Sequence, residues 1–109
     1  MDTVIATGES GKRYEFELFE KGTHFKSLSG VYIFLRHENQ NRFDPVYIGE
    51  ADSFRDRIDE NFELHHQYNC ISKNKYTHIA VLIVQGDRKR RLDIETDLRQ
   101  GNPSFCNKQ

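Results

Sequence analysis

Two tyrosines that are close in sequence are the first residues that could do chemistry. They lie in two short strings, Gly30-Val31-Tyr32 and Tyr47-Ile48-Gly49. A free phenol has a pKa near 10, so a tyrosine acts as a base only where a neighbouring group lowers that pKa. Taken alone, each tyrosine is also typical of an ordinary strand, because aromatic side chains favour pleated surfaces. Other residues must therefore decide between the two interpretations.

A carboxylate in the predicted C-terminal helix is a second candidate. Glu95 lies between Leu92 and Leu98 around the helix, in the middle of an apolar arc. Burial of an unpaired carboxylate costs several kcal/mol, so Glu95 needs a partner. Two partners stay open: Arg91 or Arg99, each one helical turn away, or a divalent cation such as Mg²⁺ or Mn²⁺.

A predicted helix over residues 53–67 carries an arginine and two histidines. At about 100° per residue, His65 falls on the packed side of this helix, and His66 is expected to face solvent. Arg57 lies at the border of the apolar stripe, where its stem can pack while the guanidinium reaches a cleft. The alternative for Arg57 is a surface ion pair with Glu60.

Strands must position the two tyrosines. Residues 31–35 and 46–48 alternate, so their aliphatic side chains share one face and the tyrosines lie on the other. If the polar stretch 39–44 connects the two strands as antiparallel neighbours, Tyr32 and Tyr47 stand together. The glycines of both strings would then let another group approach the backbone closely.

The remaining elements complete a small α/β domain. Strands are predicted at residues 3–7, 13–19 and 77–84, and a second helix at residues 88–100. Asp87 can cap that helix and Gly101-Asn102-Pro103 ends it. The expected fold is an α+β sandwich, with helices packed on a mostly antiparallel sheet.

In order and spacing, these residues resemble the GIY-YIG nuclease superfamily, and in particular its small stand-alone bacterial-type members. That family combines two tyrosine motifs with a helix arginine, a late glutamate and a terminal asparagine, here Tyr32, Tyr47, Arg57, Glu95 and Asn107. The resemblance covers residues 30–107. It implies a central three-stranded sheet flanked by helices, with residues 1–29 as an added N-terminal β-hairpin and the whole chain, 1–109, as one domain.

The resemblance implies metal-dependent hydrolysis of DNA phosphodiester bonds. Tyr32 or Tyr47 would help to deprotonate or orient the attacking water, and Arg57 would stabilise the negative transition state. Glu95 would be the single protein ligand of one divalent cation, Mg²⁺ or Mn²⁺. Asn107 would hold the site together through its amide.

The chain departs from the family at two positions. Asn61 stands where many members carry a histidine or tyrosine that assists the water, and an amide cannot accept a proton at neutral pH. His65 lies one turn further on, so we expect His65, rather than His66, to take that role. Glu50 stands where some members have lysine, which removes a cationic helper.

The net charge of the chain limits how it would bind nucleic acid. A net charge of −1 and a pI near 6.5 argue against bulk electrostatic coating of DNA. Positive charge is local instead, and the predicted substrate-binding residues are Arg55, Arg88, Lys89 and Arg91. The alternative for the run 88–91 is a solvated helix face. RNA is not excluded as a substrate, and a protein partner stays open.

Two other functions were weighed beside the nuclease. One is a nuclease-like module that binds nucleic acid or protein but cleaves weakly. The other is a zinc-stabilised domain using His65 or His66 with Cys70, His78 and Cys106, although their spacing matches no compact zinc motif.

The expected location is the cytoplasm. The two cysteines form no C-x-x-C unit and are expected to be free thiols in a reducing compartment. The longest apolar run, residues 79–84, is too short to span a bilayer, and the first residues do not open a signal peptide.

Overall fold

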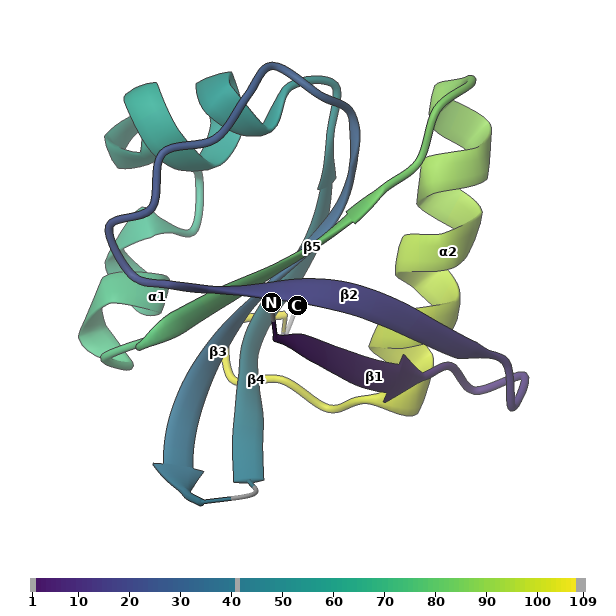
Figure 1. Cartoon of the computed structure of the whole chain (residues 1–109), viewed down its shortest axis with the longest axis horizontal. Helices are drawn as coiled ribbons and strands as arrows, with labels where there is room; N and C mark the ends of the chain where they lie inside the picture. Colours follow the sequence, from purple (N-terminus) through teal and green to yellow (C-terminus); the bar gives the residue numbers. More distant parts are fainter. Residues whose placement is uncertain (1, 41, 108–109) are drawn as a thin grey trace.

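The computed structural model, which describes residues 2–40 and 42–107, contains one five-stranded antiparallel sheet (Figure 1). The strand order across the sheet is β1-β2-β5-β3-β4. The strands are β1 (Thr3–Thr7), β2 (Arg13–Glu20), β3 (Gly30–Asn39), β4 (Arg42–Ala51) and β5 (His78–Ile83). The sheet curls into a half barrel whose open side lies between β1 and β4.

This sheet overturns the predicted three-stranded sheet with a separate N-terminal hairpin. Strand β2 pairs with β5, placing Glu17 opposite Val81 and Phe19 opposite Ile79. The hairpin is therefore part of the main sheet. The prediction was wrong because alternation indicates a strand but does not say which neighbour completes its hydrogen bonds.

Strands β3 and β4 confirm the predicted antiparallel pair. Tyr32 lies opposite Gly49, and Phe34 lies opposite Tyr47. Strand β5 adds to the other edge of β3, with Tyr32 opposite Val81. The two tyrosines thus lie on neighbouring strands and on one face.

The helix predicted over residues 53–67 was wrong. The chain forms a π-helical turn η1 (Arg55–Glu60), a 3₁₀ turn η2 (Phe62–Leu64) and then a short helix α1 (Tyr68–Lys73). His65 leaves the helical conformation, with φ −63° and ψ 134°. Phe62 stacks on Phe34 with ring centroids 5.0 Å apart, so packing on the sheet takes precedence over helical continuity.

Helix α2 (Arg88–Gly101) confirms the second predicted helix and its cap. The Asp87 side chain accepts a hydrogen bond from the backbone N–H of Arg90. No helix among the described residues is long and apolar enough to cross a membrane.

The predicted sandwich of helices on a three-stranded sheet was wrong, because only short helical segments pack on the two faces of the half barrel (Figure 1). The segment from η1 to α1 packs with Tyr32, Phe34 and Phe54 on one face. Helix α2 packs on the other face, where Leu98 joins Val31 and Ile48 in a mainly aliphatic cluster. The candidate site lies beside β4, at the rim that the two layers share.

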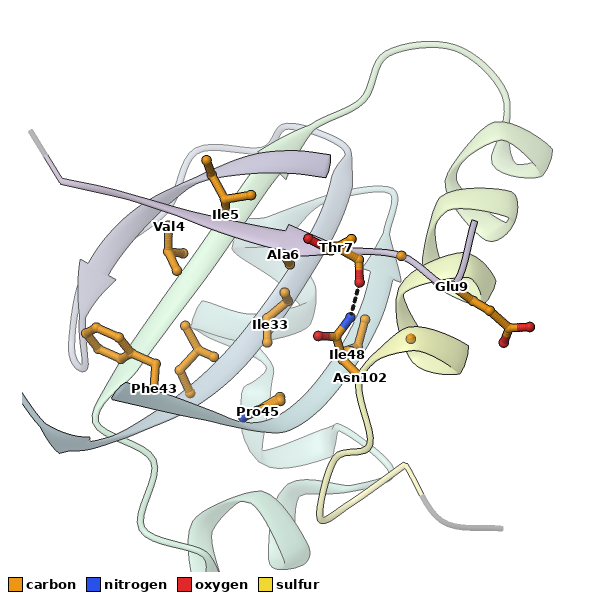
Figure 2. Close-up of a pocket in the computed structure, with 13 residues that line it drawn as sticks. Val4, Ile5, Ala6, Thr7, Glu9, Ile33, Phe43, Pro45, Ile48 and Asn102 are labelled. Atoms are coloured by element: carbon orange, nitrogen blue, oxygen red, sulfur yellow. Dashed lines mark hydrogen bonds between the residues drawn. The ribbon is translucent and has the colours of Figure 1, made fainter. Parts of the chain in front are cut away.

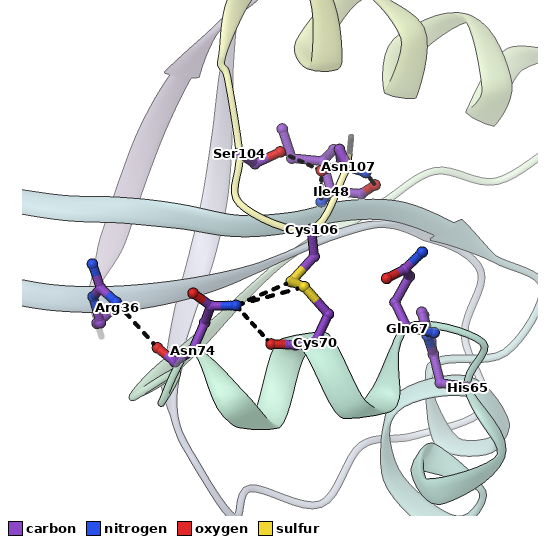
Figure 3. The surroundings of a disulfide bond; sticks show 9 residues. All are labelled: Arg36, Ile48, His65, Gln67, Cys70, Asn74, Ser104, Cys106 and Asn107. Carbon is purple, nitrogen blue, oxygen red and sulfur yellow. Dashed lines mark hydrogen bonds between the residues drawn. A yellow bond between two sulfur atoms is a disulfide. The ribbon is translucent and has the colours of Figure 1, made fainter. Parts of the chain in front are cut away.

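A disulfide joins Cys70 on α1 to Cys106 in the C-terminal segment (Figure 3). Their Cα atoms are 5.9 Å apart although 36 positions separate them in sequence. The prediction of two free thiols was wrong, because only folding shows that these distant residues meet. The cysteines therefore give no support to a reducing compartment.

Candidate active site

Gly49 makes room for both tyrosine rings. A Cβ atom at this position would lie 2.5 Å from the Tyr32 hydroxyl oxygen and 2.8 Å from Cε2 of Tyr47. Such distances are shorter than real Cβ contacts, so any larger residue would push the rings apart. With glycine in place, the ring centroids are 6.1 Å apart. The close approach inferred from the second string is confirmed.

Tyr32 and His65 form a buried pair. The Tyr32 hydroxyl lies 2.7 Å from Nε2 of His65. The backbone N–H of Gln67 donates to Nδ1 of the same imidazole at 2.9 Å. Nδ1 is thus an acceptor, so in the neutral ring Nε2 carries the hydrogen and donates it to the Tyr32 oxygen.

The protonation state of His65 follows from its surroundings. Burial, with the neighbouring His66 and Arg57, lowers the pKa of His65 to about 4. His65 is therefore neutral near pH 7 and serves Tyr32 as a hydrogen-bond donor.

Tyr47 and His66 form a second, more open pair. The Tyr47 hydroxyl lies 3.3 Å from Nε2 of His66, which is exposed. Nη2 of Arg99 donates to the Tyr47 oxygen at 3.1 Å, so the hydroxyl hydrogen is free to point to His66. Exposure of His66 was predicted, but its contact with a tyrosine was not, because that prediction assumed one continuous helix.

Arg57 lines the same cleft as the two histidines. Arg57, Leu64, His65 and His66 line a cleft of about 440 Å³ together with Asp56 and Asn61. Burial raises the pKa of Tyr32 well above its ordinary value, whereas the charge of Arg57 acts to lower it. Burial also raises the pKa of Tyr47, and Arg99 and Arg57 oppose that rise. The two arginines oppose this rise but do not reverse it, so the pKa of both phenols stays raised and both tyrosines are protonated near pH 7.

Glu95 lies close enough to act on both phenols. Its side chain is only 12% exposed and approaches Nη2 of Arg99 at 3.6 Å. Burial raises the pKa of Glu95, Arg99 lowers it and the charge of Glu50 raises it. The negative charge of Glu95 in turn raises the pKa of Tyr32 and Tyr47. Of the partners predicted for Glu95, Arg99 is present, and a hydrogen bond from the Glu50 backbone also acts to lower the pKa of Glu95, but burial keeps that pKa raised.

These residues fit a hard divalent cation. A half-buried carboxylate with a raised pKa gains from an added positive charge, and carboxylate oxygen suits Mg²⁺ or Mn²⁺. Within residues 2–40 and 42–107, no group of three or more His, Cys, Asp and Glu residues is arranged to hold a metal. A cation at Glu95 would therefore keep most of its ligands as water or substrate oxygen. The zinc alternative loses Cys70 and Cys106 as thiolate ligands, since both are in the disulfide.

Asn107 supports the strand that carries Tyr47. Its Oδ1 accepts from the backbone N–H of Ile48 at 2.7 Å, and its Nδ2 donates to the Ile48 carbonyl at 3.0 Å (Figure 3). The Cys106 N–H donates to the Val46 carbonyl at 2.8 Å. The C-terminal segment thus lies along the outer edge of β4, and the disulfide ties it to α1.

Three of the four predicted phosphate contacts are in ion pairs. Arg91 is buried and bonds to Glu50 at 3.0 Å and to Asp52. Arg88 lies 3.6 Å from Glu50, and Lys89 lies 3.0 Å from Asp93. Arg55 is exposed on η1, next to the cleft residue Asp56. Arg91 is therefore held within the fold, whereas Arg88 and Lys89 remain exposed at the surface of α2.

Sequence reasoning missed two residues of this site. The sequence predicts Arg99 only as an ion-pair partner of Glu95, and His66 only as a solvent-facing residue. The spacing of Glu95 and Arg99 was the available signal for the first. No signal in the sequence showed that the chain turns at His65, which brings His66 to Tyr47.

Comparisons of the chain with family models, with curated proteins and with solved structures find no match. The geometry of the site is therefore the basis for a functional proposal.

Proposed function

We propose that the protein is a metal-dependent endonuclease of the GIY-YIG type that hydrolyses DNA phosphodiester bonds. The observations that carry this proposal are that Arg57, His65 and His66 line one cleft, that each histidine contacts a tyrosine, and that the charge of Glu95 acts on both phenols. Phenols, a guanidinium and a carboxylate supply proton transfer, charge neutralisation and a cation site, which phosphodiester hydrolysis requires.

The outer pair performs the proton transfer. The attacking water gives a proton to the Tyr47 oxygen while the Tyr47 hydroxyl proton passes to Nε2 of His66. The oxygen of the water forms a bond to phosphorus, and the bond from phosphorus to the leaving sugar oxygen breaks, with its electron pair staying on that oxygen, which takes a proton from solvent. Arg99 keeps its hydrogen bond to Tyr47 throughout and stabilises negative charge on the phenol.

The other residues bind and position. Arg57 neutralises the charge that develops on the phosphate oxygens. Tyr32 is fully buried behind Tyr47, so Tyr32 and its donor His65 are positioning residues. Asn107 holds the backbone of β4 in register beside Tyr47. A divalent cation held by Glu95 would supply Lewis-acid stabilisation of the transition state.

A cleavage assay tests the proposal. The full chain is incubated with single-stranded, duplex, nicked and branched DNA, and with RNA, in the presence of Mn²⁺, Mg²⁺ or chelator. We expect cation-dependent strand cleavage that Tyr47→Phe removes. Tyr68→Phe is the matched control, because Tyr68 packs on Phe62 outside the cleft. Absence of cleavage on every substrate would contradict the enzyme assignment.

A second candidate is a nuclease-like module that binds nucleic acid or protein and cleaves weakly. Two observations favour it: burial raises the pKa of both phenols, and most of the basic run is in ion pairs. DNA binding by the wild type without cleavage at any cation concentration would favour this candidate.

A further inference from the structure

A second cavity, of about 420 Å³, lies where the curled sheet stays open between its edge strands β1 and β4. Figure 2 shows apolar side chains around it, from Val4 and Ala6 on β1 to Ile33, Phe43 and Pro45 on β3 and β4. Its volume falls within the range of about 300–1,000 Å³ that is typical of ligand sites. This cavity is separate from the cleft that Arg57 and His66 line.

The backbone edge of β1 forms one wall of the cavity. Consecutive residues from Val4 to Glu9 all line it. Successive side chains of a strand point to opposite faces, so side chains from one face alone cannot account for an unbroken series. The main chain of β1 must therefore contribute to the wall.

The hydrogen bonds to β2 show which groups point outward. The Leu18 N–H donates to the Asp2 carbonyl at 2.9 Å, and the Gly8 N–H donates to the Lys12 carbonyl at 2.8 Å. Bonded and non-bonded positions alternate in an antiparallel pair, so even-numbered residues of β1 bond to β2. The odd-numbered residues, Thr3, Ile5 and Thr7, direct their N–H and C=O groups to the open edge.

One contact agrees with this assignment. The Asn102 side chain donates to the outward carbonyl of Thr7 at 2.8 Å (Figure 2). Among the described residues, β1 has no strand neighbour other than β2. The strand thus presents main-chain donors and acceptors, centred on Ile5, directly beside an apolar cavity.

We propose that β1 binds an extended peptide segment of a partner protein as a sixth strand. Main-chain hydrogen bonds to the odd-numbered residues would hold the peptide, and its alternate side chains, which must be apolar, would fill the cavity. On the other face, Glu17, Glu15 and Arg13 are paired with Thr3, Ile5 and Thr7. Lysine or arginine at the peptide positions beside Thr3 and Ile5 would reach Glu17 and Glu15. A second copy of β1 carries only Thr3, Ile5 and Thr7 on this face and offers the glutamates no positive charge.

The first test uses a short peptide that alternates valine and lysine, with the full chain observed by amide NMR and hydrogen exchange. We expect saturable binding and slower exchange of the amides of Ile5 and Thr7. A control peptide of the same composition, with valines and lysines in separate blocks, is expected to bind at least about tenfold more weakly. No binding, or shifts confined to the cleft around Arg57, overturns the proposal.

The second test separates strand addition from simple apolar contact. Two versions of the peptide carry N-methyl groups either on the edge that faces β1 or on the opposite edge. Methylation of the facing edge is expected to abolish binding, and methylation of the other edge to leave it within about twofold. Equal binding of both versions overturns the proposal, as does self-association of the chain that competes with the peptide.

A protein variant also separates main-chain hydrogen bonding at β1 from simple apolar contact. Ile5→Pro removes an outward N–H without removing a bond to β2, and proline is tolerated on edge strands. We expect at least about a tenfold loss of peptide affinity with the amide spectrum of the other strands retained. Unchanged affinity in a folded variant overturns the proposal, and the N-methyl peptides decide the question if the variant does not fold.

Discussion

The two tyrosine–histidine pairs of the site differ in how they are held. In the inner pair, Tyr32 is 0% exposed and His65 is 6% exposed, and a backbone N–H fixes the orientation of the imidazole. In the outer pair Tyr47 is also buried, at 3% exposed, but the contact is longer, 3.3 Å against 2.7 Å, and His66 is exposed. Burial fixes the protonation state of a group, whereas an exposed imidazole exchanges protons with water. We therefore assign positioning to the inner pair and proton transfer to the outer pair.

The largest expected effect comes from Glu95, whose charge reaches both pairs. Glu95→Gln should abolish cation-dependent cleavage while the midpoint of thermal unfolding changes little, because glutamine keeps the shape of the side chain. Asp93→Asn, an exposed change on the same helix, is the control and should cleave normally. Unchanged nicking by Glu95→Gln would remove the assignment of Glu95 as metal ligand.

Substitution of Arg57 tests whether this cleft residue contributes to the reaction at Tyr47 and His66. Arg57→Ala should lower turnover by about 10²–10³, the effect of losing one transition-state donor, with little loss of stability. Arg55→Ala, an exposed neighbour, should have a smaller effect on turnover. If stability collapses in Arg57→Ala while specific activity survives, the arginine is structural.

Removal of the disulfide tests whether this bond holds Tyr47 and His66 in position. It ties α1, which follows His66, to the segment that supports Tyr47 through Ile48. Replacing Cys70 and Cys106 by serine should lower the free energy of unfolding by about 3–4 kcal/mol, from loop closure over 36 positions. Hydrogen exchange at the Ile48 amide should accelerate more than at Tyr32. Wild type in reductant should behave like the variant, and equal stability with and without the bond would contradict this account.

The pH dependence of stability tests the inner pair. The pKa of His65 is lowered from 6.5 to about 4 in the folded protein, so the unfolded state binds a proton that the folded state does not between those values. The stabilisation is present above pH 6.5 and is lost as pH falls toward about 4, by up to about 3 kcal/mol. His65→Gln should remove this part of the pH dependence in urea unfolding curves. An unchanged pH dependence would show that His65 is not the group responsible.

The smallest expected effect distinguishes the two histidines. His66→Gln should lower turnover by about 10², the lower end for a proton-transfer group, with unchanged stability, because His66 accepts the proton of Tyr47. His65→Gln should act mainly on the midpoint of thermal unfolding, through Tyr32. Loss of turnover only in a stable His65→Gln would reverse the roles and restore the role that the sequence suggested for His65.

Local patterns predicted the parts of the fold that depend on near neighbours. The alternation of side chains in residues 31–35 predicted strand β3, and Asp87 predicted the start of helix α2. The pairing of β2 with β5 and the contact of Cys70 with Cys106 join residues far apart in sequence, so no local pattern contains them. The break at His65 was missed because it depends on Phe62 stacking on Phe34.

The sequence by itself determined that two tyrosines share a face beside a glycine, since the period of a strand and the absence of a Cβ atom at Gly49 are local properties. Only the tertiary structure decided which histidine can accept a proton. The Gln67 N–H reaches Nδ1 of His65 only after the chain turns there, and the same turn carries His66 to Tyr47. Hydrogen-bond direction depends on where the backbone lies in space, and long-range packing sets that position.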